Sequence, residues 1–193
     1  MLIFFIILAL LLFVMILLFF GVRVGKQGIY FWKKSPNFGR PIRYIIIHGT
    51  GLTSDKEALS YLRDKSKEVS CHYFIDSKGT LFQLVRDSDI AWHAGESFWG
   101  NDKSLNFTSL GIELFNPSAG NGKAYTAQQY RTLIKLLNLL INKYDIPVSN
   151  VLGHCDIAPD RKTDPGYLFD WDRLYYANVC DLSRVQKRGR CER

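Results

Sequence analysis

The chain lacks several patterns that would assign it to a common class at once. Its 193 residues contain no internal repeat and no low-complexity tract, so it is not a repeat array. Neither HExxH nor CxxC occurs, which excludes two familiar local zinc motifs. Histidine is scarce, so few imidazoles are available for chemistry: His48, His72, His93 and His154. No cysteine precedes Cys71, which excludes a lipid-attached cysteine at the N-terminal segment.

Charged and polar side chains are also absent from the run Leu2 to Phe20. A run of this length matches the ~20 apolar residues that are needed to cross a ~30 Å hydrocarbon core, so it predicts a membrane or export segment. A cleavable signal peptide normally has a basic start and a cleavage site of small residues, whereas Phe19-Phe20-Gly21 offers one small residue. We therefore expect a transmembrane anchor or signal segment over residues 1–21, with an uncleaved anchor favoured, and a linker over residues 22–40.

The remaining sequence has the size and composition of one globular domain. At 47% hydrophobic residues, the chain has enough apolar content to bury a single core. We place the domain at residues 41–177 and a basic C-terminal tail at residues 178–193. The formal charge of +7, from 25 basic and 18 acidic residues, suits a partner that carries anionic polymer, lipid or carboxylates. We expect no nucleic-acid partner, because no nucleic-acid motif is present and a membrane segment precedes the domain.

The hydrophobic pattern predicts the α/β class, as a single domain with a central mixed β-sheet flanked by helices. Ser77-Lys78-Gly79 predicts a hairpin turn. Ser54 to Glu57 is a capping-box pattern that begins a helix to about Arg63, and Thr126 to Gln129 begins another through about Tyr144. Five strands are expected from the apolar runs, at residues 42–48, 72–76, 80–85, 109–114 and 148–153.

Two histidines and one aspartate form a candidate zinc site. His48 ends the apolar run of one predicted strand and His154 follows another, and strand ends are where a fold can bring distant side chains together. Asp164 precedes Pro165, which restricts its backbone toward extended geometry and suits a fixed ligand. A catalytic zinc typically takes three protein ligands and leaves a fourth position for water, a count that these residues satisfy. A lone histidine beside a strand is more often structural, so spacing alone does not decide between the two roles.

Five sequence blocks occur in the order, and at about the intervals, of one known family. They are residues 44–50, 69–76, 91–95, 109–114 and 153–171. From about Ile42 to Trp171 the chain resembles the zinc-dependent N-acetylmuramoyl-L-alanine amidases of the type 2 family, the AmpD/AmiD kind, which are related to peptidoglycan recognition proteins. The resemblance implies a Zn²⁺ cofactor and an amidase catalytic domain at residues 41–177. The implied reaction is hydrolysis of the amide between the lactyl group of N-acetylmuramic acid and L-alanine of the stem peptide, in peptidoglycan or muropeptides.

The functional residues of the family carry over position by position. The resemblance implies zinc ligands at His48, His154 and Asp164, a catalytic acid and base at Glu113, and an oxyanion-stabilising lysine at Lys162. Alternation places Glu113 on the strand face opposite Ile112 and Leu114, which indicates a cleft floor. Glu113 would take a proton from water and return it to the leaving nitrogen, while Lys162 would stabilise the oxyanion.

The segment Trp92 to Gly95 combines aromatic faces with small residues, which suits sugar rings and peptide backbone. We name Trp92 and His93 as substrate-binding candidates. A structural role for His93 stays open as the alternative.

The four cysteines are Cys71, Cys155, Cys180 and Cys191, and they allow three complete pairings. In an oxidising compartment we expect Cys180 with Cys191, since that bridge would pin the C-terminal tail. Cys155 neighbours His154, but adjacent side chains on an extended segment point to opposite faces, so we expect a structural role. The resemblance implies no chemistry for Cys71.

The basic flank and the implied substrate give opposite predictions for the compartment of the domain. A basic flank follows the apolar run, and the positive-inside tendency would keep it in the cytoplasm. Peptidoglycan lies outside the inner membrane, so the implied function places a monomeric, membrane-anchored or exported domain in the periplasm, with the cytoplasmic orientation as the alternative. Two other functions stay open: a non-catalytic peptidoglycan-recognition module, and a phage-type endolysin with the same chemistry.

Overall fold

The computed structural model describes residue 7, residues 22–25 and 28–31, and residues 40–183. The chain divides into two compact units, residues 1–39 and 40–193. In the first unit, β1 (Val22–Gly25) pairs antiparallel with β2 (Gly28–Phe31), so the segment predicted as a linker contains a short ribbon. Apart from Ile7, the apolar run predicted as an anchor lies outside the described residues. Within the described ranges, no helix has both the length and the apolar character that a membrane span requires.

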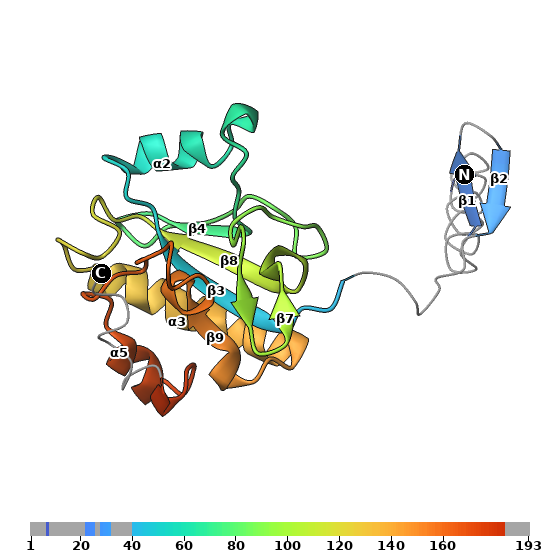
Figure 1. The fold of residues 1–193 in the computed structure, drawn as a ribbon. Helices are drawn as coiled ribbons and strands as arrows, with labels where there is room; N and C mark the ends of the chain where they lie inside the picture. Colours follow the sequence, from blue (N-terminus) through green and yellow to red (C-terminus); the bar gives the residue numbers. More distant parts are fainter. Residues whose placement is uncertain (1–6, 8–21, 26–27, 32–39, 184–193) are drawn as a thin grey trace. The chain divides into compact units, whose positions relative to one another are not determined.

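The second unit is built on a five-stranded mixed sheet with the strand order β5-β4-β8-β3-β9 (Figure 1). β4, β8, β3 and β9 run parallel to one another, and β5 pairs antiparallel with β4 through the predicted hairpin. The prediction of a central mixed sheet is therefore confirmed. The strands are β3 (Tyr44–Gly49), β4 (Tyr73–Ile75), β5 (Leu81–Gln83), β8 (Ser109–Leu114) and β9 (Val151–Gly153).

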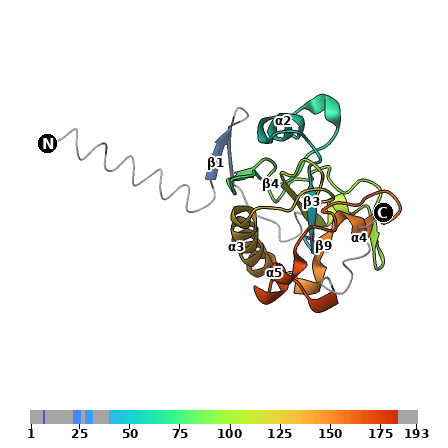
Figure 2. The same ribbon diagram turned by 90° about the vertical axis from the view of Figure 1, so that its left-hand side faces the viewer.

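The long helix α3 (Ala127–Tyr144) covers one face of this sheet, as Figures 1 and 2 show. Its predicted capping box is present: the Gln129 backbone N–H donates to Thr126 Oγ1 at 3.2 Å, and the Thr126 N–H donates to Gln129 Oε1 at 2.9 Å. These bonds satisfy two of the backbone donors that a helix start leaves without intrahelical partners. The buried stripe of α3 joins the sheet in the main core, which includes Leu133, Leu137 and Leu140 of the helix with Ile45, Ile47, Leu110, Ile112 and Leu114 of the sheet.

A second helix, α2 (Asp55–Tyr61), begins where the capping-box pattern predicts, but only half of that box forms. The Glu57 N–H donates to Ser54 Oγ at 3.2 Å, while the Glu57 carboxylate accepts its shorter backbone hydrogen bond from the Thr53 N–H at 2.9 Å. Ala58 of α2 packs in a small cluster with Phe74 of β4, on the face of the sheet that α3 does not cover. This cluster forms one wall beside the candidate site.

Several short elements were not predicted, and the expected strand over residues 148–153 was too long. Its first half is a 3₁₀ turn that follows Pro147, whose ring fixes its backbone and removes a donor. The additional elements are η1 (Lys65–Lys67), β6 (Phe98–Trp99), β7 (Asp102–Lys103), η2 (Leu105–Phe107), η3 (Val148–Asn150), α4 (His154–Ile157) and α5 (Trp171–Tyr176).

The cysteines differ from the expected pairing. Cys180 is buried in the main core, where its thiol donates to the Trp171 carbonyl at 3.7 Å. Among the cysteines that the structure describes, Cys155 is the one that forms a disulfide. The expected Cys180–Cys191 bridge is therefore wrong, because Cys180 keeps its thiol and that thiol donates to a main-chain carbonyl of α5. Cys155 also lies in the short helix α4, so the argument from an extended segment does not apply to it.

Candidate metal centre and active site

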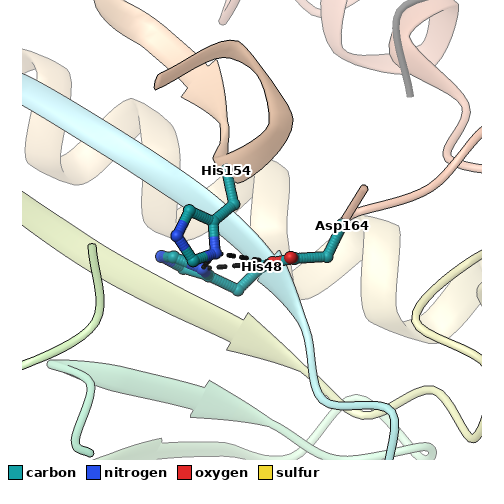
Figure 3. A group of neighbouring side chains, drawn as sticks. All are labelled: His48, His154 and Asp164. Carbon is teal, nitrogen blue, oxygen red and sulfur yellow. Dashed lines mark hydrogen bonds and ion pairs between the residues drawn. The ribbon is translucent and has the colours of Figure 1, made fainter. Parts of the chain in front are cut away.

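The three predicted ligands lie far apart in the sequence and converge in the structure (Figure 3). His48 stands near the carboxyl end of β3, His154 begins α4, and Asp164 follows α4 in a loop. The Nδ1 atom of His48 lies 2.9 Å from Nδ1 of His154 and 3.2 Å from Oδ2 of Asp164. Nδ1 of His154 lies 3.1 Å from the same oxygen. All three side chains are buried.

This donor set fits zinc. Imidazole nitrogen and carboxylate oxygen are both regular zinc ligands, and tetrahedral bonds of ~2.1 Å place ligand atoms about 3.4 Å apart, close to the spacing found here. The Nδ1 atoms of His48 and His154 face each other and also face the carboxylate oxygen. One shared proton cannot give all three of these atoms a hydrogen bond. A divalent cation can satisfy all three, because each atom then directs a lone pair toward it.

Burial keeps His48 in the form that binds metal. Desolvation, reinforced by the nearby His154 imidazole, lowers the pKa of His48 to about 4. His48 is therefore neutral at pH 7, with one ring nitrogen free to coordinate. Burial alone would raise the pKa of Asp164, but its hydrogen bonds with His154 and His48 lower it below the usual range, so the carboxylate stays ionised.

Glu113 stands beside His48 because β3 and β8 are parallel and place these two residues in register. Its Oε2 atom is buried and has no hydrogen-bond partner among the described residues. Burial, with a contribution from the charge of Asp164, raises the pKa of Glu113 to about 8, while Lys162 opposes that shift. A buried carboxyl group without a partner is costly to fold, so its position indicates a functional role.

One cavity contains the three ligands together with Glu113 and Lys162, all five of the residues that the family resemblance singled out. His93 lines it too and is buried, whereas Trp92 is 55% exposed and lines an adjacent hollow. The two spaces share Leu62 and Val69 as a common wall. The other residues lining the cavity are Gly49, Thr50, Leu52 and Tyr61.

The sequence did not identify the residues that hold the segment in contact with the candidate ligands. Asn106 is the clearest case: its Oδ1 atom accepts hydrogen bonds from the backbone N–H groups of His93, at 3.0 Å, and Ala94, at 2.7 Å. Gly111 offered the one usable signal, since a glycine inside an apolar strand often marks a close approach. A Cβ atom at that position would lie 2.4 Å from Cγ of His93.

Comparison with known proteins agrees with this geometry. The N-acetylmuramoyl-L-alanine amidase family matches residues 38–167. The chain is 40% identical over 146 residues to the N-acetylmuramoyl-L-alanine amidase AmiD of Escherichia coli K12, covering 69% of this chain and 52% of AmiD. It is 44% identical over 106 residues to the 1,6-anhydro-N-acetylmuramyl-L-alanine amidase AmpD of Citrobacter freundii, covering 55% of each chain. The chain thus spans about half the length of these relatives.

A solved structure has a similar fold. It is the complex of AmiD from E. coli with the substrate anhydro-N-acetylmuramic acid-L-Ala-D-gamma-Glu-L-Lys, which superposes with a TM-score of 0.69 at 34% identity and covers 86% of this chain and 70% of that chain. With a family match over most of the folded unit and these two relatives, the chain belongs to the N-acetylmuramoyl-L-alanine amidase family, as a type 2 amidase of the AmpD/AmiD kind.

Proposed function

We propose that this protein hydrolyses the amide bond between the lactyl group of N-acetylmuramic acid and L-alanine of the stem peptide, in peptidoglycan or its fragments. The observation that carries this proposal is the single cavity that holds three converging donor atoms, a lysine and a carboxyl group whose Oε2 atom has no hydrogen-bond partner in the described part of the chain. The solved AmiD complex supports the substrate class, since its ligand is an anhydromuramyl peptide.

The cofactor that we propose is Zn²⁺, held by Nδ1 of His48, Nδ1 of His154 and Oδ2 of Asp164. When bound, zinc would acidify a water molecule and polarise the scissile carbonyl. Replacing His154 with alanine removes one of three ligands, so we expect the His154→Ala protein to lose both zinc and turnover. Metal content by atomic emission, measured beside turnover on one preparation, checks this.

Glu113 is the proposed general base and acid. It would take a proton from the attacking water and return it to the alanine nitrogen as the amide bond breaks, a role worth typically 10²–10⁴-fold in rate. The base must be ionised, although burial in the metal-free protein raises the pKa of Glu113 to about 8. The positive charge of Lys162 and of a divalent cation on the neighbouring ligands both favour the carboxylate.

Lys162 is the proposed electrostatic partner of the carbonyl. Its side chain lines the same cavity as the ligands and Glu113. A fixed positive charge there would stabilise the negative charge that develops on the carbonyl oxygen as water adds. A non-catalytic recognition module would need neither this lysine nor a buried carboxyl group, so the complete set favours an enzyme.

The decisive experiment is incubation of the zinc-loaded protein with defined muropeptides, followed by mass spectrometry. Release of an intact stem peptide with a free L-alanine amine is the expected result. Cleavage within the sugar chain, or between peptide residues, would contradict the proposed bond. Binding of muropeptide without any cleavage by the zinc-loaded protein would support the recognition module instead.

We further propose that the domain is membrane-anchored or exported, monomeric, and active in the periplasm. The apolar run Leu2 to Phe20 supports a membrane or export segment by its length and lack of charge. Protease added to spheroplasts should then degrade the domain. Survival of the domain while outer-leaflet proteins are digested would favour the cytoplasmic orientation.

A further inference from the structure

Each of the two histidine ligands uses its second ring nitrogen for a contact inside the protein. Nε2 of His48 lies 3.1 Å from Nδ1 of His93, and Nε2 of His154 lies 3.2 Å from the carbonyl oxygen of Ala94. The two contacts thus come from consecutive residues of one segment. Both His93 and Ala94 are buried, at 6% and 0% exposure, so water does not compete freely for these contacts.

The direction of each hydrogen bond follows from the chemistry. A carbonyl oxygen can only accept, so Nε2 of His154 carries the proton and its Nδ1 keeps a lone pair. In His48 the Nδ1 atom also faces the ligand point, so Nε2 is again the donor and Nδ1 of His93 the acceptor. The resulting tautomer is the one that can coordinate a metal through Nδ1.

The hydrogen-bond chain continues behind His93 in a consistent direction. With Nδ1 accepting, the proton of His93 resides on Nε2, which lies 3.4 Å from Oγ of Ser109. Ser109 in turn donates to the Leu105 carbonyl at 2.6 Å. Each donor therefore faces an acceptor along the chain of hydrogen bonds from His48 through His93 and Ser109 to the Leu105 carbonyl.

The segment is also held in place independently of the ligands. Asn106 accepts the backbone N–H groups of both His93 and Ala94, and Arg161 donates to the Ala94 carbonyl at 2.8 Å. The ring of His93 rests on Gly111, where a side chain would collide with it. His93 therefore has a fixed position to which His48 must conform.

We propose that His93 is a positioning residue that sets the tautomer and ring orientation of the zinc ligand His48, as the Ala94 carbonyl does for His154. The inference rests on the metal set of the proposed function, and it replaces the expectation that His93 binds substrate. Removing an outer partner of this kind typically costs about 10–100-fold in metal affinity.

The test compares two variants of nearly equal size, His93→Leu and His93→Asn, in the full-length protein. The asparagine Oδ1 atom can accept the hydrogen bond of His48 where Nδ1 of His93 does, whereas leucine offers no acceptor. We expect His93→Leu to lower zinc affinity by about 10–100-fold, measured by competition with a chelator, and His93→Asn to stay within a few-fold of the parent. Thermal unfolding of the metal-free proteins controls for folding. If the leucine variant does not fold, His93→Ala serves in its place, because alanine is smaller and likewise offers no acceptor.

A spectroscopic measurement of the His48 tautomer complements the measurement of zinc affinity. Long-range ¹H–¹⁵N spectra of histidine-labelled protein report which ring nitrogen carries the proton. In the parent and the asparagine variant we expect a single Nε2–H form of His48, and in the leucine variant a mixture of tautomers.

The outcomes separate this inference from the proposed function, because neither readout needs substrate. Unchanged zinc affinity in His93→Leu, with a raised KM for muropeptides, would overturn the inference and restore substrate contact. Equal loss in the leucine and asparagine variants would overturn it also. The expected affinity pattern in a protein that cleaves no muropeptide would support the positioning role and refute the amidase.

Discussion

The two faces of the sheet differ sharply, although they are made by the same strands. The apolar face, defined by Ile45 and Ile47 of β3 and their neighbours on β8, packs against α3 in one large core. The site face begins apolar at Ile46 but ends at His48, beside Glu113. Alternation along a strand separates the two sets by a single residue. One face can therefore stabilise the fold while the other holds groups that burial disfavours.

The position of the polar groups along the strands adds to this contrast. Ile46 packs with Leu105 and Leu152 in a small cluster, whereas His48 and Glu113 lie at the carboxyl ends of the parallel strands β3 and β8. This is the edge at which open α/β sheets bind ligands. The comparison implies that substitutions on the site face alter rate or metal binding, and that substitutions on the apolar face alter stability.

The largest expected effect is on turnover in Glu113→Gln. The amide cannot accept the proton of water, so kcat should fall by about 10²–10⁴-fold. Zinc content should stay at the parent level, because Glu113 is not one of the three ligands. Steady-state kinetics and metal analysis of the same sample measure both. Full activity with retained zinc would remove Glu113 from the mechanism.

A somewhat smaller loss is expected for Lys162→Met, which keeps the length of the side chain and removes its charge. Loss of one oxyanion-stabilising group typically lowers kcat by about 10²–10³-fold. Lys135→Met, at an exposed lysine of α3, is the matched control and should leave kcat unchanged. A rise in KM with kcat unchanged would instead assign Lys162 to substrate binding.

The apolar face should respond in the opposite way. Leu137→Ala removes a fully buried side chain of α3, and the free energy of unfolding should fall by about 2–5 kcal/mol. Its neighbour Leu139 is 56% exposed, so Leu139→Ala should change stability by no more than about 0.5 kcal/mol. Urea unfolding gives these values, and kcat at 25 °C should match the parent in both. A loss of kcat in folded Leu137→Ala protein would contradict the assignment of stability to one face of the sheet and catalysis to the other.

The last expected effect is a pH dependence of stability that comes from Glu113. In the metal-free protein its pKa is about 8, above the ordinary value of 4.5, so the folded state holds this proton to higher pH than the unfolded state. The contribution is complete below about pH 4.5 and is lost as the pH rises through 8. In EDTA, Glu113→Gln should therefore gain roughly 4 kcal/mol over the parent between pH 5 and pH 9. A constant difference across that range would show that the proton is not held.

The extent to which the sequence predicts this protein varies with the length of the elements. β8 begins and ends at the predicted residues, and α3 begins at its predicted cap, because long periodic patterns and side-chain caps are local properties. α4 has four residues, too few for a periodic pattern, and forms where the Gly153 N–H donates to Asp156 Oδ2 at 2.8 Å. Elements of this size depend on contacts that the sequence does not display.

The site shows the same division. The family resemblance names the three ligands together with Glu113 and Lys162, and the structure brings all five to one cavity. The outer partners of the ligands were missed, since Ala94 acts through its main chain and Asn106 through a contact made only after folding. Cys180 was misjudged because a thiol in the core and a thiol in a bridge look alike in sequence.

The two hydrogen-bond acceptors behind the proposed ligands, His93 and the Ala94 carbonyl, also differ in how easily a mutation can remove them. A backbone carbonyl persists whichever amino acid the gene encodes at position 94, so the acceptor for His154 survives any missense change there that keeps the local path of the chain. The acceptor for His48 belongs to a side chain, and one altered codon at His93 deletes it. A single missense mutation can therefore remove the acceptor for His48 more easily than the acceptor for His154.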